Sequence, residues 1–166
     1  MSNKQQLTKS KAGFTIIEVV LVLAIAGLIF LMVFVALPAL QRSQRDTQRR
    51  EDVSRVANAL TQYQTNNGGA LPPSKSSATN LKDTLVKNYL DGDNFKGPSG
   101  DPYLVYIYEK SNNSTIAGKG SISIKRMHIY TYANCDGELP VYSSAARNYA
   151  IVLKLEGAGY YCLDNK

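Results

Sequence analysis

The carboxylate of Glu18 has the most unusual chemical setting in this chain. It stands directly before the apolar run from Val19 to Leu40, which carries no charge and is interrupted only by Gly27 and Pro38. A helix rises about 1.5 Å per residue, so this run could cross the roughly 30 Å hydrocarbon core of a bilayer. Because a carboxylate is costly in lipid, its presence there predicts a functional site with a charged partner.

Cys135 and Cys162 are the two cysteines, and both lie far beyond the apolar run. If this part of the chain is exported, a disulfide is the expected state. Two free buried thiols are the alternative. A zinc site is disfavoured, because the single His128 cannot complete a ligand set.

Nothing in the sequence predicts catalysis. His128 stands between Met127 and Ile129 in an alternating segment, which is typical of an ordinary sheet residue. Ser143 and Ser144 have no acid–base pair near them in the sequence, and no glycine-rich phosphate loop follows an expected strand. We therefore expect a protein that is not an enzyme and that uses no cofactor.

Two weaker binding signals have ordinary structural explanations. Asp91, Asp93, Asn94 and Asp101 offer the oxygen ligands of a calcium site, but solvated acids in a turn give the same pattern. Basic residues also alternate with tyrosines, which could bind DNA or another surface, or could be a soluble surface over tyrosines packed on a helix. This second set consists of Lys110, Lys119, Lys125, Arg126, Tyr106, Tyr108, Tyr130 and Tyr132.

The length and charge of the chain limit its organisation. With 166 residues, it has room for one membrane segment and one domain of about a hundred residues. A net charge of +6 is too small to imply nucleic acid by itself.

The first residues are basic and contain no acid, as in a targeting segment. A secretory signal would place small residues for cleavage after the apolar run, whereas Gly13-Phe14 precedes it. Cleavage there would remove a leader, residues 1–13, and leave the apolar helix on the mature chain.

The segment Lys11-Ala12-Gly13-Phe14-Thr15-Ile16-Ile17-Glu18 resembles the class III signal of type IV prepilins and pseudopilins. This resemblance implies cleavage after Gly13 by a prepilin peptidase, N-methylation of Phe14, and a role for Glu18 in assembly. Pro38, which should kink the helix, resembles the position where pilin helices bend or unwind. The segment Pro98–Tyr103 resembles an element found before the first strand of many pilins, and a Cys135–Cys162 bridge would resemble their cysteine-bounded C-terminal region.

An arginine flank follows the apolar run and conflicts with the expected topology. It consists of Arg42, Arg45, Arg49, Arg50 and Arg55. Counted simply, the positive-inside rule would place this flank in the cytoplasm. The cleavage signal requires the leader to lie there instead, so we expect the arginines to face acids of neighbouring subunits or lipid headgroups after assembly.

The predicted fold is α+β, a long helix packed on a small antiparallel sheet of three or four strands. The helix has a membrane or filament-core half, residues 14–40, and an amphipathic half, residues 41–67. The amphipathic half carries the apolar stripe Val53, Val56, Ala57, Leu60 and Tyr63 and should end at Asn66–Gly69. A connector with a short helix, residues 68–102, precedes the sheet, residues 103–166. The expected strands are Tyr103–Glu109, Ser121–Ala133, Tyr149–Glu156 and Tyr160–Leu163.

The resemblance implies a structural subunit of a type IV pilus, and we favour a major pilin. A pseudopilin of a secretion or DNA-uptake system is the first alternative, and a monomeric membrane-anchored binding domain is the remote one. The implied partners are further copies of the chain, the prepilin peptidase, an inner-membrane platform protein and an assembly ATPase. DNA or cell surfaces are further family possibilities, with roles in adhesion, twitching motility and DNA uptake. The expected location is the inner membrane before assembly and an extracellular pilus afterwards.

Overall fold

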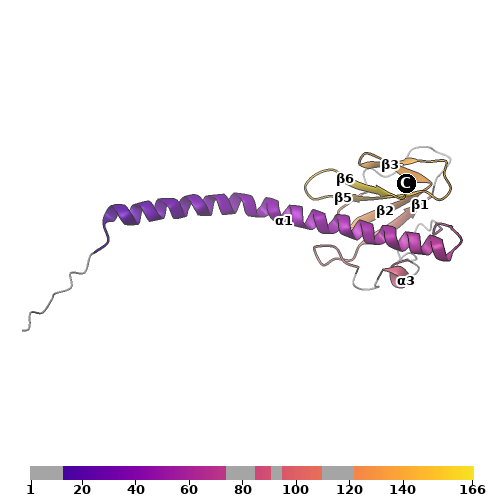
Figure 1. The fold of residues 1–166 in the computed structure, drawn as a ribbon, viewed down its shortest axis with the longest axis horizontal. Coiled ribbons are helices and arrows are strands. Elements are labelled where there is room, and N and C mark those ends of the chain that lie inside the picture. The colour runs from indigo at the N-terminus through magenta and orange to yellow at the C-terminus, as the bar shows by residue number, and fades with distance from the viewer. Residues whose placement is uncertain (1–12, 74–84, 91–94, 110–121) are drawn as a thin grey trace, which may run out of the picture. The chain divides into compact units, whose positions relative to one another are not determined.

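The computed structural model describes residues 13–73, 85–90, 95–109 and 122–166. The chain divides into two compact units, residues 1–40 and 41–166, and we describe each unit by itself. Figure 1 shows the elements in chain order: α1 (Ile16–Asn66), α3 (Lys87–Tyr89), β1 (Leu104–Tyr108), β2 (Arg126–Thr131), β3 (Ala133–Asp136), β4 (Leu139–Tyr142), β5 (Tyr149–Lys154) and β6 (Tyr160–Asp164).

Helix α1 ends where the sequence predicts. Gly68 and Gly69 follow with φ angles of 63° and 88°, a conformation that glycine adopts without steric cost. The Gly69 N–H donates to the Gln64 carbonyl at 2.7 Å, so one of the last carbonyls of the helix is satisfied. The described part of the predicted short helix in the connector consists of α3 and, before it, the buried Leu85 and Val86. The start expected for this helix, with Asn80, Leu81 and Asp83, lies outside the described residues.

The α+β fold is confirmed, but the sheet is mixed instead of wholly antiparallel. Its strand order is β1-β2-β5-β6. The β2–β5 and β5–β6 pairs are antiparallel, as predicted, whereas β1 and β2 run parallel. A parallel pair needs a crossover of about a dozen residues or more, and residues 109–125 are long enough to supply it. The prediction was wrong for this pair because alternation within a strand says nothing about its direction.

The predicted strand Ser121–Ala133 contains β2, Arg126–Thr131, and only the first residue of β3, which belongs to a different sheet. Tyr132 breaks it with a φ of 55°, and the chain then forms the antiparallel β3–β4 hairpin, a second sheet. Cys135 consequently lies in β3 and does not end the second strand. Strand β4 was not predicted because it contains Pro140, which removes a backbone donor and normally argues against a strand. Here β4 pairs with β3 alone, so the proline is tolerated at an edge.

One face of the four-stranded sheet packs against the second half of α1. Val53, Val56 and Leu60, all fully buried, are the predicted apolar stripe of the helix. They share one core with side chains of β1, β2 and β5: Val105, Ile107, Met127, Ile129, Ile151 and Leu153. Burial of these apolar side chains stabilises the packing of α1 on the sheet.

The opposite face of the sheet forms a second, smaller core. Tyr130, Ala150 and Val152 pack there with Ala133 of β3. The expected disulfide is present: Cys135 of β3 is bonded to Cys162 of β6, with their Cα atoms 5.9 Å apart. The bond therefore joins the two sheets over this second core.

His128 lies on the same face, fully buried among tyrosines. Its ring centroid is 5.1 Å from that of Tyr108 and 5.6 Å from that of Tyr106, and its Nδ1 lies 3.4 Å from the Tyr130 hydroxyl. Burial, and secondarily the Arg126 charge, lowers the pKa of His128 to about 4. The imidazole is therefore neutral at ordinary pH and belongs to the packing, as its sequence context predicts.

Removing the disulfide should destabilise the globular unit without changing its apolar cores. With Cys135 and Cys162 both replaced by Ala, we expect the free energy of unfolding to fall by about 3–4 kcal/mol, because the unfolded chain regains the entropy of the 27-residue loop. Denaturant unfolding of wild type and variant measures the difference. A loss well below about 1 kcal/mol would contradict this account.

His128 should make the unit less stable as the pH falls. Its pKa is about 4 when folded and about 6.5 when unfolded, so the unfolded state binds the proton first. The contribution of the neutral imidazole is complete above pH 6.5 and is lost between pH 6.5 and 4, to a total of about 3 kcal/mol. Carboxylates also titrate in this range, so the measurement is the difference in pH dependence between wild type and His128→Phe. Parallel curves for the two proteins would show that His128 is not the cause.

Candidate functional site

The N-terminal motif opens helix α1. Gly13 and Phe14 are exposed and precede the helix. The Thr15 carbonyl accepts the N–H groups of Glu18 at 3.2 Å and Val19 at 3.3 Å, and the Thr15 hydroxyl lies 3.4 Å from the same Glu18 N–H. Thr15 thus caps the helix, as threonine commonly does. This role of Thr15 was not predicted, although Thr15-Ile16-Ile17-Glu18 has the spacing of a capping box.

Glu18 has a favourable local position and no partner for its charge. It lies in the first turn of α1, where a carboxylate interacts favourably with the helix dipole. Within the described part of the chain, no cation forms an ion pair with it. The carboxylate is therefore available to a positive group outside the described residues or on another molecule.

The first half of α1 presents apolar side chains all around. Each large apolar side chain from Phe14 to Leu40 is at least 45% exposed. This segment is long and apolar enough to cross a membrane, by length and composition. Such a surface is stable only against lipid or against other apolar helices. Gly27 and Pro38 lie within α1, and bending at Pro38 stays a prediction.

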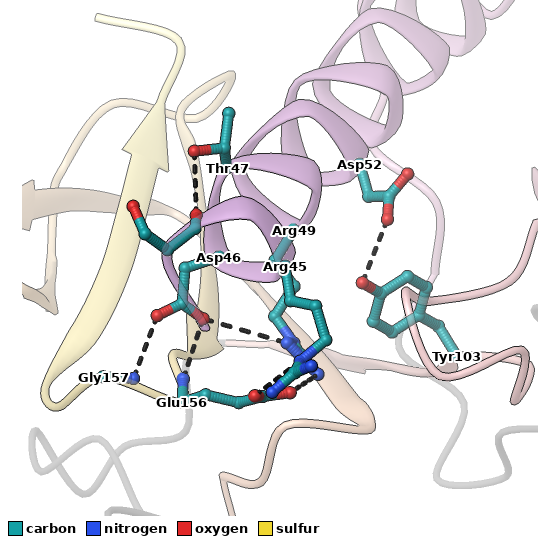
Figure 2. A network of polar contacts seen from close by, with 9 residues as sticks. Arg45, Asp46, Thr47, Arg49, Asp52, Tyr103, Glu156 and Gly157 are labelled. Atoms are coloured by element: carbon teal, nitrogen blue, oxygen red, sulfur yellow. Dashed lines mark hydrogen bonds and ion pairs between the residues drawn. The ribbon is translucent and has the colours of Figure 1, made fainter. Parts of the chain in front are cut away.

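Four of the five flanking arginines have contacts within the described part of the chain. The Arg45 Nε donates to Glu156 Oε2 at 2.8 Å, and the Arg49 Nη2 donates to Glu156 Oε1 at 2.7 Å (Figure 2). Arg55 lies 3.4 Å from the buried Asp52. Arg50 lies over the Tyr161 ring, 5.6 Å from its centroid. The expectation that the whole flank faces neighbouring subunits or lipid was wrong for the buried Arg49; it stays a prediction for these other three side chains. Their partners lie within the same chain, and for Glu156 more than a hundred residues away.

Asp46 and Glu156 complete a reciprocal set of contacts between α1 and the β5–β6 turn. The Asp46 carboxylate accepts the backbone N–H of Glu156 at 2.8 Å and that of Gly157 at 2.9 Å (Figure 2). We call Arg45, Asp46, Arg49, Glu156 and Gly157 the hairpin clamp. Arg49 is only 2% exposed, so one of these ion pairs lies deep in the structure.

A second polar anchor joins α1 to the chain before β1. The Tyr103 hydroxyl donates to Asp52 Oδ2 at 3.0 Å, as Figure 2 shows. Burial is the largest cause that raises the pKa of Asp52, and burial together with the Asp52 charge raises the pKa of Tyr103. Tyr103 ends the predicted Pro98–Tyr103 element, and its ring packs over Gly97, where a Cβ would lie 3.1 Å from Cζ. The element thus positions Tyr103 against the helix.

The calcium prediction finds no support in the described residues. Asp101 forms an exposed ion pair with Lys125 at 2.7 Å. Asp91, Asp93 and Asn94 lie outside the described residues. Among the residues that the structure describes, no group of three metal-ligating side chains occurs.

The basic and tyrosine-rich set is only partly described, and its tyrosines do not pack on the helix. Tyr106, Tyr108 and Tyr130 alternate with core residues that face α1 and so lie on the opposite sheet face, where Tyr108 stacks on Tyr130 at 5.2 Å. Tyr130 is 1% exposed and cannot stack on a nucleic-acid base, while Arg126 lies over the Tyr106 ring. Lys110 and Lys119 lie outside the described residues.

Comparison with known proteins identifies the N-terminal segment alone. Residues 8–34 match the family model of the prokaryotic N-terminal methylation motif. No curated protein and no solved structure matches the chain. The matched residues contain Gly13, Phe14 and Glu18 together with most of the exposed apolar helix, so the chain carries the class III signal of type IV pilins, and this motif supports the pilin and pseudopilin family.

Proposed function

We propose that this chain is a structural subunit, the major pilin, of a type IV pilus. Cleavage after Gly13 and methylation of Phe14 produce the mature protein, which polymerises through residues 14–40. One observation carries the proposal: the N-terminal methylation motif leads directly into an apolar helix whose large side chains are all exposed. A filament of such helices would cover this surface, and the chain would act without catalysis or a cofactor.

In this proposal Glu18 selects the register between subunits. Its partner is the ammonium of Phe14 in an adjoining copy, which remains cationic after methylation. A buried ion pair contributes little net stability, but breaking it is costly, so it favours one axial offset among many. Cohesion comes from burial of the apolar surface, including Ile16, Ile17, Val19, Leu21 and Leu23.

The remaining partners and the location follow from the same proposal. Before assembly, the apolar helix holds the chain in the inner membrane with residues 41–166 outside, and a prepilin peptidase removes the leader. A platform protein and an assembly ATPase extrude the pilus, so the energy of ATP hydrolysis comes from partners. Adhesion, twitching motility and DNA uptake are functions that such a fibre serves.

A pseudopilin of a secretion or DNA-uptake system shares the motif and is the second candidate. Within a pilus, two features favour the major subunit over a minor one. Glu18 is present, whereas subunits that initiate a tip often lack this acid, and residues 41–166 form one small unit.

Replacing Gly13 should block maturation. In Gly13→Val the branched side chain disfavours cleavage, so we expect the protein in the membrane to keep residues 1–13 and an unmethylated terminus. Mass spectrometry of the purified chain measures both, and Ser10→Ala, a change within the leader, should mature normally. A Gly13→Val protein that begins at methylated Phe14 would refute the cleavage assignment.

Replacing Glu18 should abolish fibres while leaving the protein in the membrane. In Glu18→Ala the carboxylate that pairs with the neighbouring terminus is absent, so we expect at least about a tenfold loss of assembled fibre, the cost of one buried charge contact. Shear fractions and membrane fractions measure the two pools.

The matched control is Glu51→Ala, which removes an exposed acid from the same helix beyond the apolar segment. It should leave the fibre yield unchanged. Normal fibres from Glu18→Ala would defeat the proposed mechanism, and no fibres from the wild-type chain in a competent host would favour the anchored monomer.

A further inference from the structure

The face of α1 that contacts the sheet changes character along the helix. Its first buried residues are charged: Asp46, Arg49 and Asp52. The first buried apolar residue of the helix is Val53, and the fully hydrophobic contact begins there. Hydrophobic burial therefore holds the helix from Val53 onward, whereas polar contacts hold the section from Arg45 to Asp52.

The hairpin clamp makes this polar contact reciprocal. Arginines from two successive turns of α1 donate to the two oxygens of Glu156, at 2.8 and 2.7 Å. The Asp46 carboxylate accepts the N–H groups of Glu156 and Gly157, so the same turn both donates and accepts. Such a set of directional contacts fixes the turn at one position along the helix.

The clamp is better suited to positioning than to stability. Arg49 is buried, and its Nε and Nη1 have no hydrogen-bond partner. Desolvation of a buried ion pair offsets much of its Coulomb attraction, and an apolar replacement is often equally stable. A buried ionic contact with unpaired donors is therefore expected to be retained for its geometry.

The position of the clamp explains why its residues are charged. Apolar residues at 45, 46 and 49 would leave only Gln41, Arg42, Ser43 and Gln44 between the apolar surface that ends at Leu40 and the apolar core. Charged side chains end that surface and still attach the helix to the sheet. The chain thus meets two opposing requirements within a few turns.

We propose that the hairpin clamp is a positioning device for assembly. It fixes where the sheet region attaches to helix α1. With the clamp closed, attachment begins at Arg45. With the clamp open, the remaining contacts are those of Arg50, which lies over the Tyr161 ring, and of Asp52, which accepts the Tyr103 hydroxyl. Attachment then begins roughly 8 Å further along the helix at 1.5 Å per residue. This inference rests on the proposed function, because the free length of helix sets the axial position of each globular unit in a fibre.

The test uses the full chain, first in detergent and then in assembled fibres. Glu156→Gln removes the carboxylate charge and keeps the backbone donors to Asp46. We expect hydrogen exchange of the amides between residues 45 and 52 to become at least about tenfold faster, as the loss of charged hydrogen bonds requires. The matched control is Glu138→Gln, whose carboxylate accepts the Tyr160 N–H of the same hairpin but does not contact α1.

A second variant separates positioning from stability. The double change Arg49→Met with Glu156→Leu replaces the ion pair by apolar contact, so we expect an unchanged unfolding midpoint and unchanged leader removal. We also expect its fibres to be lost or to show an altered or irregular subunit repeat by cryo-electron microscopy. A purely stabilising role predicts wild-type fibres from this variant, and that result would overturn the proposal.

The two readouts distinguish this inference from the proposed function. Unchanged exchange in Glu156→Gln overturns the clamp, whatever the fibres do. A wild-type chain that forms no fibres overturns the proposed function, while faster exchange in Glu156→Gln would still support the clamp as the attachment point.

Discussion

Helix α1 must satisfy two environments with one helix, whose backbone hydrogen bonds are interrupted at Pro38 because proline has no N–H. From Phe14 to Leu40 its apolar side chains have no cover in the described structure, and from Val53 onward they are buried against a sheet. A helix is the appropriate element for the first part, because it satisfies its backbone groups internally in lipid or between apolar neighbours. The same element then supplies one wall of an ordinary hydrophobic core. The other features of the structure follow from this division.

Between the two apolar parts, charged residues make the connection. Glu156 receives two arginines, Asp46 binds the β5–β6 turn, and Asp52 accepts the Tyr103 hydroxyl. These contacts join α1 to the β5–β6 turn and to the chain before β1 without enlarging the apolar surface. Three of the arginines after the apolar run have acidic partners within the fold: Arg45 and Arg49 pair with Glu156, and Arg55 pairs with Asp52.

The sheet is stabilised from both faces, and each face uses a different means. The face toward α1 relies on aliphatic burial. The other face combines a tyrosine and histidine cluster with the Cys135–Cys162 bond to the β3–β4 hairpin. For a small domain that can bury only a limited core, a covalent link between sheets contributes a stabilisation that packing alone would not supply.

Features that depend on neighbouring residues were predictable from the sequence. The motif at Gly13–Glu18, the apolar segment, the helix end at Gly68–Gly69 and the strands around β1, β5 and β6 are local patterns of spacing and residue type. Pairings between distant segments emerged only in the folded chain. Folding placed Glu156 against Arg45 and Arg49, made β1 parallel to β2 and bent the chain at Tyr132. It also turned Tyr106, Tyr108 and Tyr130 away from α1. These outcomes depend on contacts between residues far apart in the chain, where periodicity and local propensity carry no information about direction or partner.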